Sequence, residues 1–449
     1  MAAKDVFTPA YRSLVDDVPE ETPITVIVRT GNVKPLRDEA ETAHGALLTE
    51  QLATRPSQLL ALAHEEYGAG PAFLYNFRDS RLEAHENVIA AAPEAASLWL
   101  ADAVAVTGTP AEIAELADHD DVVAIDVNRE FHLPRILQTP LEDTPDLVDG
   151  STWGVAKIGA LDTWSGFGRG DDVLVGVLDT GVDDTHPALA GKVVAFEEFD
   201  GLGSPLGTAT HDSHIHGTHV CGTIAGRTYR GTNIGVAPHA RLAVALVLPS
   251  GSGTFAQIVS GMQWTLDQGV HVMNMSLGGS GYSTLWNLPV LIATLSGTLV
   301  VASIGNSGHG TSGGPGNDPL ALGIGATDTH DVVAGFSGGQ SLTVGHDVFG
   351  RINYMKPDIS APGVSVVSSV PGPDMVALSG TSMAAPHVSG AAALLMSSEP
   401  VLRGNPLSVR EIFLGVGRED YGEAGRDQRF GYGRVDAMAA AEAAVSQFS

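Results

Sequence analysis

The sequence contains little cysteine and little lysine. Cys221 is the single cysteine among 449 residues, so no disulfide can form within the chain. Only five residues are lysines, and 24 basic residues stand against 52 acidic ones, which gives a net charge of −28. Such a surface repels nucleic acid and anionic membranes, and neither is expected as a partner. It is also typical of proteins adapted to high salt, where screening weakens like-charge repulsion; a merely acidic protein is the alternative.

Long apolar segments are missing as well. The first 14 residues hold no apolar run of about 7 to 15 residues, so they do not resemble a secretory signal. The localisation stays open between a cytoplasmic protein and one exported after loss of a signal. The stretch 288–304 is apolar, but Ser, Gly and Thr interrupt it at 296–298. This pattern predicts a buried helix followed by a strand rather than a membrane span.

The length and composition predict two folded units. A chain with 43% hydrophobic residues and 54 glycines is typical of a globular protein, and a single core stops growing near about 250 to 300 residues. The periodic apolar pattern breaks at Leu133–Ser151, where three prolines and four acidic residues predict an exposed linker. We therefore expect a first unit at 1–146, which includes linker residues 133–146, and a second at 147–449.

The first unit is predicted to be a small α+β domain. Residues 103–127 fit a strand, a helix and a second strand, with Thr109 and Glu112 forming a capping box around a proline at the first helical position. An earlier strand is expected at Pro23–Arg29, and a long helix at 36–66.

The second unit carries short, continuous apolar runs that alternate with helical segments. Strands of this kind are buried on both faces, which predicts an α/β fold with a parallel sheet covered by helices on each side. In such sheets the chemistry lies beyond the carboxyl ends of the strands. The five runs are 173–179, 241–248, 270–276, 298–303 and 321–326.

Several residues near the ends of these elements suit acyl transfer, which needs a nucleophile, a base, a group that orients the base, and oxyanion donors. Ser382 lies in a run of small residues. Because Pro386 is tolerated only in the first turn of a helix, Ser382 is expected at a helix N-terminus, where negative charge is favoured. Taken alone, a serine in such a run is usually a packing residue.

Three further side chains can complete such a site. Asp179 ends an apolar strand, His216 begins a short helix closed by Gly226, and Asn306 follows another strand in a glycine-rich turn. The residues alone do not decide between His216 and His219 as the base.

Together these motifs resemble those of subtilisin-like serine proteases. The similarity extends from Trp153 to about Ala444 and follows the family order: VLDTGVDDTHP, HGTHVCGTIAG, VMNMSLGG, ASIGNSG and SGTSMAAPHVSGAAALL. It implies a serine endopeptidase with Asp179, His216 rather than His219, and Ser382 as the catalytic triad. It also implies that Asn306 donates to the oxyanion.

The resemblance further implies where protein or peptide substrates bind. Ser276, Leu277, Gly278 and Gly279 would line one wall of the cleft. The other edge, at 249–255, would pair with the substrate backbone and give broad specificity, with a preference for an apolar or aromatic residue before the scissile bond. This edge contains Ser250, Gly251, Ser252 and Gly253.

The first unit would then correspond to the family's propeptide, which assists folding and inhibits the enzyme. The resemblance implies a self-processing precursor whose tail, NREFHLPRILQ after Val127, lies along the cleft as a strand beside 276–279. Cleavage is expected between His132 and Ser151. The folding role has a physical basis, because a parallel sheet of non-local strands forms slowly without help.

The chain departs from the family at a loop that often binds calcium. Arg227–Asn233 brings two positive charges and no carboxylate, so this site is expected to be lost, and no cofactor is expected to be required. Calcium near Asp183, Asp184 or Asp200 remains an alternative. Cys221 is expected to be a small buried hydrophobe, with a reagent-sensitive thiol as the other possibility.

Three rival functions remain open. Four histidines and an aspartate at 211–219 offer enough ligands for a zinc enzyme. The triplet Asp179-Thr180-Gly181 matches that of aspartic proteases, but these need two such carboxylates and the chain has no second copy. A catalytically inactive member used as a binding module is the third, although all three triad residues and Asn306 are present.

Overall fold

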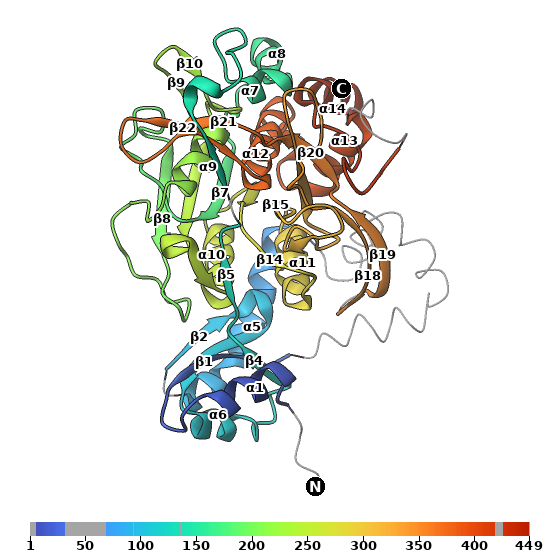
Figure 1. Ribbon diagram of the computed structural model, residues 1–449. Coiled ribbons are helices and arrows are strands. Elements are labelled where there is room, and N and C mark those ends of the chain that lie inside the picture. The colour runs from blue at the N-terminus through green and yellow to red at the C-terminus, as the bar shows by residue number, and fades with distance from the viewer. Residues whose placement is uncertain are drawn as a thin grey trace.

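A computed structural model describes residues 6–31, 69–92, 94–134, 136–347, 349–417 and 425–448 (Figure 1). The first unit contains a four-stranded antiparallel sheet in the order β2-β3-β1-β4. The predicted strand, helix and strand at 103–127 are confirmed, with the capping box between Thr109 and Glu112. The helix expected at 36–66 lies outside the described residues. The elements are α1 (Pro9–Asp17), β1 (Ile24–Arg29), α5 (Pro71–Ala91), β2 (Glu94–Leu98), η1 (Trp99–Ala101), β3 (Ala103–Gly108), α6 (Pro110–Leu116) and β4 (Ala124–Val127).

Both faces of this small sheet are buried because its side chains alternate between two apolar clusters. Val26 and Val28 of β1 pack with Ile113 and Leu116 of α6, whereas Ile27 between them belongs to a cluster shared with the second unit. One face of this sheet therefore packs in the core of the first unit, and the other face packs against the second unit.

The second unit is built on a seven-stranded sheet in the order β20-β17-β15-β13-β7-β11-β8, and every pairing in it is parallel. The five predicted runs form its five inner strands. The two edge strands were missed because VVAFEE is only half buried and ISAP is four residues long, so neither carries a continuous apolar signal. The strands are β7 (Leu174–Asp179), β8 (Val193–Glu198), β11 (Arg241–Leu246), β13 (Val272–Met275), β15 (Leu299–Ser303), β17 (Leu322–Thr327) and β20 (Ile359–Pro362).

Helices cover both faces of this sheet, which confirms the predicted α/β architecture. Val175 and Val177 of β7 face the cluster formed with α9 and α12, while Leu178 faces α10 and α11. The apolar stretch 288–304 becomes α11 followed by β15, and none of the described helices is long and apolar enough to cross a membrane. The covering helices are α9 (His216–Ala225), α10 (Phe255–Asp267), α11 (Asn287–Leu295) and α12 (Thr381–Ser398), with α13 (Pro406–Val416) and α14 (Ala437–Phe448) beside α12.

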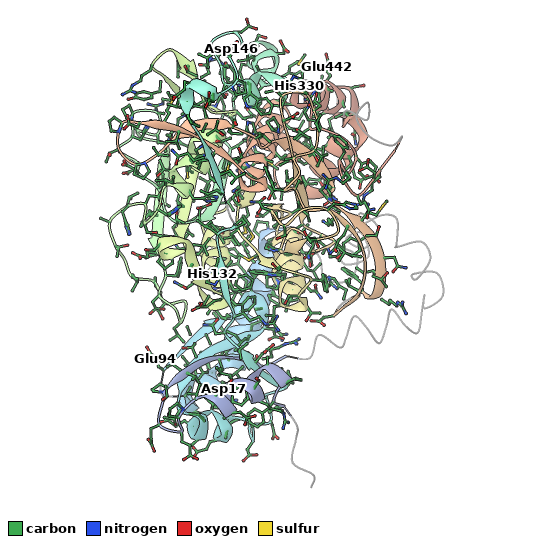
Figure 2. All side chains as sticks on the ribbon, viewed as in Figure 1. Asp17, Glu94, His132, Asp146, His330 and Glu442 are labelled. Carbon is green, nitrogen blue, oxygen red and sulfur yellow. The ribbon has the colours of Figure 1, made fainter. Side chains whose placement is uncertain are left out.

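The expected linker at 133–151 is largely exposed, but part of it forms secondary structure. It contributes β6 (Leu137–Thr139), paired with β22 (Met375–Ser379), which in turn pairs with β21 (Val366–Ser369). The residues just before the linker form β5 (Glu130–His132), paired with β12 (Ser252–Thr254). In Figure 2, His132 lies near the middle of the molecule and Asp146 at the end away from the first unit. Backbone pairing between distant residues, which composition does not reveal, turns this proline-rich segment into strands.

Buried ionisable groups predict that the fold loses stability in acid. Burial lowers the pKa of His219 and His346 to about 3 and that of His387 to about 4, so these side chains stay neutral when the unfolded chain already binds protons. Burial raises the pKa of Asp318 to about 7, so between about pH 4 and 7 this carboxyl holds a proton in the folded chain but not in the unfolded one. Its contribution to the free energy of unfolding therefore rises as the pH falls, opposite to that of the histidines.

Near pH 5, three histidines against one carboxyl leave a net uptake of about two protons by these four groups on unfolding. The free energy of unfolding should therefore fall as the pH drops below about 6.5, and by about 2.7 kcal/mol per pH unit near pH 5. Denaturant unfolding of the Ser382→Ala protein, which excludes self-digestion, measures this slope. A free energy that is constant between pH 6.5 and 4.5 would contradict the prediction.

Candidate active site

Three neighbouring inner strands bring the predicted site residues to one edge of the sheet. Asp179 ends β7, Ser276 follows the end of β13, and Asn306 lies three residues beyond β15. These strands are adjacent in the sheet and parallel, so their carboxyl ends meet at the same edge. The helices α9 and α12 begin there, with His216 as the first residue of α9 and Ser382 as the second of α12.

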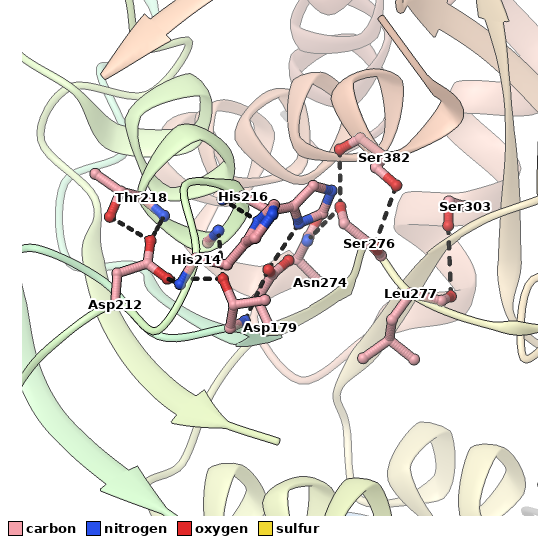
Figure 3. A network of polar contacts seen from close by, with 12 residues as sticks. Asp179, Asp212, His214, His216, Thr218, Asn274, Ser276, Leu277, Ser303 and Ser382 are labelled. Atoms are coloured by element: carbon pink, nitrogen blue, oxygen red, sulfur yellow. Dashed lines mark hydrogen bonds and ion pairs between the residues drawn. The ribbon is translucent and has the colours of Figure 1, made fainter. Parts of the chain in front are cut away.

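Asp179 and His216 form a buried hydrogen-bonded pair. The His216 Nδ1 and the Asp179 Oδ1 lie 2.7 Å apart, and both side chains are fully buried (Figure 3). A carboxylate only accepts, so Nδ1 donates, and in the neutral ring Nε2 is then an acceptor. The His216 Nε2 has no partner among the described residues, so it is available to a reacting group.

The start of α9 is held tightly against the turn that follows β7. Gly217 is required there, because a Cβ on it would collide with the carbonyl oxygen of Gly181. The carboxylate of Asp212 accepts hydrogen bonds from Thr180 Oγ1 at 2.7 Å and from Thr218 N and Oγ1 at 2.7 and 2.6 Å. These bonds hold the first turn of α9, which carries His216, against the turn after β7. The role of Asp212 was missed, since it was considered only as a zinc ligand.

Ser382 and Ser276 exchange hydrogen bonds. The Ser382 Oγ donates to the Ser276 carbonyl oxygen at 3.1 Å, and the Ser276 Oγ donates to the Ser382 carbonyl oxygen at 2.9 Å (Figure 3). The expected position of Pro386 in the first turn is wrong, because α12 begins at Thr381 and Pro386 lies in its second turn. Its missing N–H would have bonded to the Ser382 carbonyl, and Ser276 supplies the replacement donor.

Asn306 lies beside the N-terminus of α12. Its Oδ1 accepts hydrogen bonds from Thr381 N at 2.9 Å and Thr381 Oγ1 at 2.8 Å. Its Nδ2 is 3.1 Å from the point where a Cβ on Gly380 would stand. The amide group is thus oriented by its oxygen, with its nitrogen turned towards the residues just before Ser382.

An open space of about 630 Å³, which we call the groove, lies beside Asn306. One border contains Leu277, Gly278 and β14 (Gly279–Ser280), which pairs with β16 (Gly313–Gly314), and residues 130–134 form another. The predicted cleft residues Leu277, Gly278 and Gly279 therefore line this space. Ser250 and Gly251 of the short η3 turn (Pro249–Gly251) and Ser252 and Gly253 of β12 do not line it.

The groove already holds a segment of the chain. Strand β5 pairs antiparallel with β12, with Phe131 opposite Gly253, rather than with the 276–279 edge as expected. Phe131 is 6% exposed, packs against Gly279, and makes an edge contact with Trp286 at 5.3 Å between ring centroids. The Phe131 side chain contacts the expected 276–279 segment at Gly279, whereas the backbone hydrogen bonds of β5 are made with β12.

The residues of the rival zinc hypothesis do not converge. His216 bonds to Asp179, the His219 Nε2 contacts the Val366 carbonyl oxygen, and His211 faces Glu198. Among the described residues, no three or more His, Cys, Asp or Glu side chains are grouped to hold a metal ion. Cys221 is fully buried, and burial raises the pKa of its thiol well above the usual range, which fits an inert packing residue.

Comparison with known proteins agrees with this geometry. The model of the subtilase family matches residues 170–433, more than half of the chain. Subtilisin DY of Bacillus licheniformis is 40% identical over 247 residues, which cover 54% of this chain and 83% of that protein. Subtilisin Savinase of Lederbergia lenta is 40% identical over 250 residues, covering 55% and 85%. The alkaline protease of Alkalihalobacillus alcalophilus is also 40% identical over 250 residues, covering 55% and 60%.

A parallel sheet with a histidine–carboxylate pair and a helix-end serine at its carboxyl edge carries the chemical groups that serine hydrolases use. The chain belongs to the subtilase family, and it is a serine endopeptidase of the subtilisin type. The matched residues begin after the first unit, so the function of that unit has to be argued from its contacts.

Proposed function

We propose that the chain is a self-processing endopeptidase precursor whose triad is Asp179, His216 and Ser382. The observation that carries the assignment is the 2.7 Å bond between Asp179 and His216, which leaves the His216 Nε2 as an acceptor. In the reaction, the Ser382 hydroxyl would leave the Ser276 carbonyl and give its proton to this nitrogen. The Ser382 oxygen then attacks the peptide carbonyl, and Asp179 stabilises the imidazolium that forms.

Negative charge on the carbonyl oxygen would be met by the amide nitrogen of Asn306 and by the backbone amides at the start of α12. Return of the proton from His216 to the amine releases the first product and leaves an acyl group on Ser382. Water activated by His216 then hydrolyses this ester. Nucleophile, base and oxyanion donors all come from the chain, so the reaction requires no cofactor.

We propose broad specificity with an apolar or aromatic residue preferred before the scissile bond. Apart from residues 130–134, which belong to the first unit's tail, the groove wall is uncharged, and it includes Leu277 and glycines at 278, 279, 305 and 313, which leave room. Backbone pairing along β12 would contribute affinity that depends little on side chains. The burial of Phe131 supports the same preference for apolar groups in this groove. Cleavage of a peptide library, with fragments identified by mass spectrometry, tests it.

Self-processing is supported by the path of the chain across the site. The segment passes from β5 on one groove edge to β6, which pairs with β22, and β22 ends three residues before Ser382. Between them, the Ile136 Cγ2 lies 3.7 Å from the Cβ position of Gly380. We therefore narrow the expected cleavage window of 132–151 to the connection 133–136.

The contacts of the first unit support its proposed roles as inhibitor and folding aid. Gln263 of α10 accepts a hydrogen bond from Leu100 N at 3.1 Å and donates to the Ser97 carbonyl at 3.3 Å. Arg78 pairs with Asp267 at 2.8 Å, and the buried Trp99 belongs to the apolar cluster shared with α10 and α11. A folded partner that docks on two helices and the groove would stabilise the sheet before its long loops close.

Residues 1–146, made separately, should inhibit the chain that begins at Leu147 and should speed its refolding. Phe131→Ala in the separate unit is expected to weaken inhibition by about tenfold or more, because it removes a buried aromatic anchor. Arg78→Ala serves as the matched control, since exposed ion pairs contribute about 0 to 1 kcal/mol. Inhibition and refolding assays measure both effects. Equal refolding with and without the unit, and no inhibition, would show that it has another function.

We also propose adaptation to high salt, supported by the net charge of −28. Charges at this density repel within a Debye length of about 8 Å at physiological ionic strength, which shrinks to about 3 Å at 1 M. Melting temperature and activity should both rise between 0.15 and 3 M potassium chloride. An unchanged melting point after dialysis to low salt would argue against this adaptation.

A further inference from the structure

A second pocket, of about 610 Å³, lies at the opposite edge of the main sheet from the catalytic groove. It is bordered by Gly226, directly after the last residue of α9, and by residues at 191–192 and 238–241 that precede or begin β8 and β11. The ten-residue helix α9 therefore has His216 at one end and this pocket at the other, about 15 Å apart. The pocket belongs to no part of the proposed catalytic machinery.

The lining of this pocket has the opposite charge to the rest of the chain. Four of the 24 basic residues gather around it, and its single carboxylate, Asp171, is already bonded to His239 at 2.8 Å. None of the four cations forms an ion pair with a carboxylate in the described part of the chain. We call this site the basic pocket; its cations are Arg169, Lys192, Arg227 and Arg241.

Lys192 is the most constrained of these cations. It is 5% exposed, and its ammonium donates to the Pro238 carbonyl oxygen. Burial, together with the charges of Arg227 and Arg241, lowers the pKa of Lys192 to about 8. A buried ammonium beside two guanidinium groups is unfavourable unless negative charge is brought to it.

The remaining donors can supply such a partner with hydrogen bonds. An ammonium has three donors and a guanidinium five, and charge-assisted bonds to oxyanions are among the strongest in proteins. Arg227 and Arg241 are exposed while Lys192 is buried, so the pocket offers donors both at the surface and in its interior. Arg169 stacks on Trp164 at 5.5 Å, which presents it at the pocket wall.

We propose that the basic pocket binds a small, multiply charged oxyanion. Phosphate and small polycarboxylates share the required chemistry, and the volume admits either. Bound there, the anion would neutralise the mutual repulsion of Lys192, Arg227 and Arg241 and tie the loop after α9 to the starts of β8 and β11. The anion therefore stabilises the catalytic unit without touching the catalytic groove.

The test uses the full-length Ser382→Ala protein, titrated calorimetrically with inorganic phosphate or with citrate at constant ionic strength set by potassium chloride. Constant ionic strength separates site binding from the general effect of salt. We expect saturable binding of one anion per chain and a rise in melting temperature. Stronger binding of phosphate would identify a tetrahedral oxyanion, and stronger binding of citrate a polycarboxylate.

Two arginines of one hairpin provide a matched pair of variants. Arg227 lines the basic pocket, whereas Arg230 contacts Tyr229 and Asp374 away from it. Arg227→Gln should lower the affinity about tenfold or more, the size expected for loss of one charge-assisted contact, and Arg230→Gln should change it less than about twofold. Arg241→Gln should behave like Arg227→Gln. Absence of saturable binding of both anions, or equal losses in the Arg227 and Arg230 variants, would overturn the proposal.

Discussion

Replacement of Ser382 by alanine is expected to lower turnover by about 10⁴ to 10⁶, a range taken from triad variants of subtilisin. The variant keeps the Asp179–His216 pair but has no oxygen to attack the peptide carbonyl. Because the same triad is proposed to cut the 133–136 connection, the Ser382→Ala chain should also stay at full length. Peptide hydrolysis and intact mass of the purified protein measure the two effects.

A serine on the same helix provides the control. Ser389 is also fully buried and donates to Asn274 at 2.8 Å, but it lies two turns away from the groove. Ser389→Ala should mature and retain turnover within about tenfold, since loss of one buried neutral hydrogen bond costs about 1 to 3 kcal/mol of stability rather than chemistry. A purified Ser382→Ala protein that still matures would show that another residue or another protease cuts the chain.

Replacement of Asn306 by alanine should lower kcat by about 10² to 10³ and leave KM nearly unchanged, as with the loss of the corresponding donor in subtilisin. The reason is that its amide nitrogen would approach the carbonyl oxygen only as that oxygen becomes negative. Steady-state kinetics with a peptide ester and a peptide amide separate the two constants. A change confined to KM would contradict an oxyanion role.

The Asn306→Asp variant distinguishes hydrogen-bond donation to the oxyanion from the structural role of Asn306 in holding Thr381. Aspartate keeps an oxygen that can accept from Thr381, so the contacts at 2.8 and 2.9 Å can persist, but it has no N–H to donate. Its kcat should fall at least as far as that of Asn306→Ala, while its melting temperature should remain closer to that of the unmodified protein. If Asn306→Asp retained full kcat, Asn306 would act by holding Thr381 rather than by donating.

The inner strands and the residues at their ends could be predicted because their signals are local. Continuous apolar runs such as 173–179 mark strands buried on both faces, and the change to polar residues marks where they end. This was sufficient to locate Asp179, His216 and Asn306 near element boundaries. Ser382 does lie at a helix start as predicted, although the premise that Pro386 occupies the first turn was wrong. The edge strand β8 was missed because it is only partly buried, and β20, although buried, was missed because it is only four residues long.

Other features depend on residues far apart in the chain, and only the tertiary structure decided them. Ser276 and Ser382 are 106 residues apart, so the donor that replaces the missing N–H of Pro386 could not be foreseen from the helix sequence. The segment after Val127 was expected in the groove, but its pairing with β12 depends on which edge presents free backbone groups. The four cations of the basic pocket likewise come from four separate segments.

The sequence by itself therefore determined the order of the elements and the chemical groups at their ends, because periodicity and motifs act over a few residues. Packing of the sheet decided which strand and helix ends lie together at the active site. It also decided that the segment after Val127 pairs with β12, and that four basic residues line one pocket of an acidic chain. Those outcomes are set by contacts between residues tens to hundreds of positions apart, and local pattern carries no information about them.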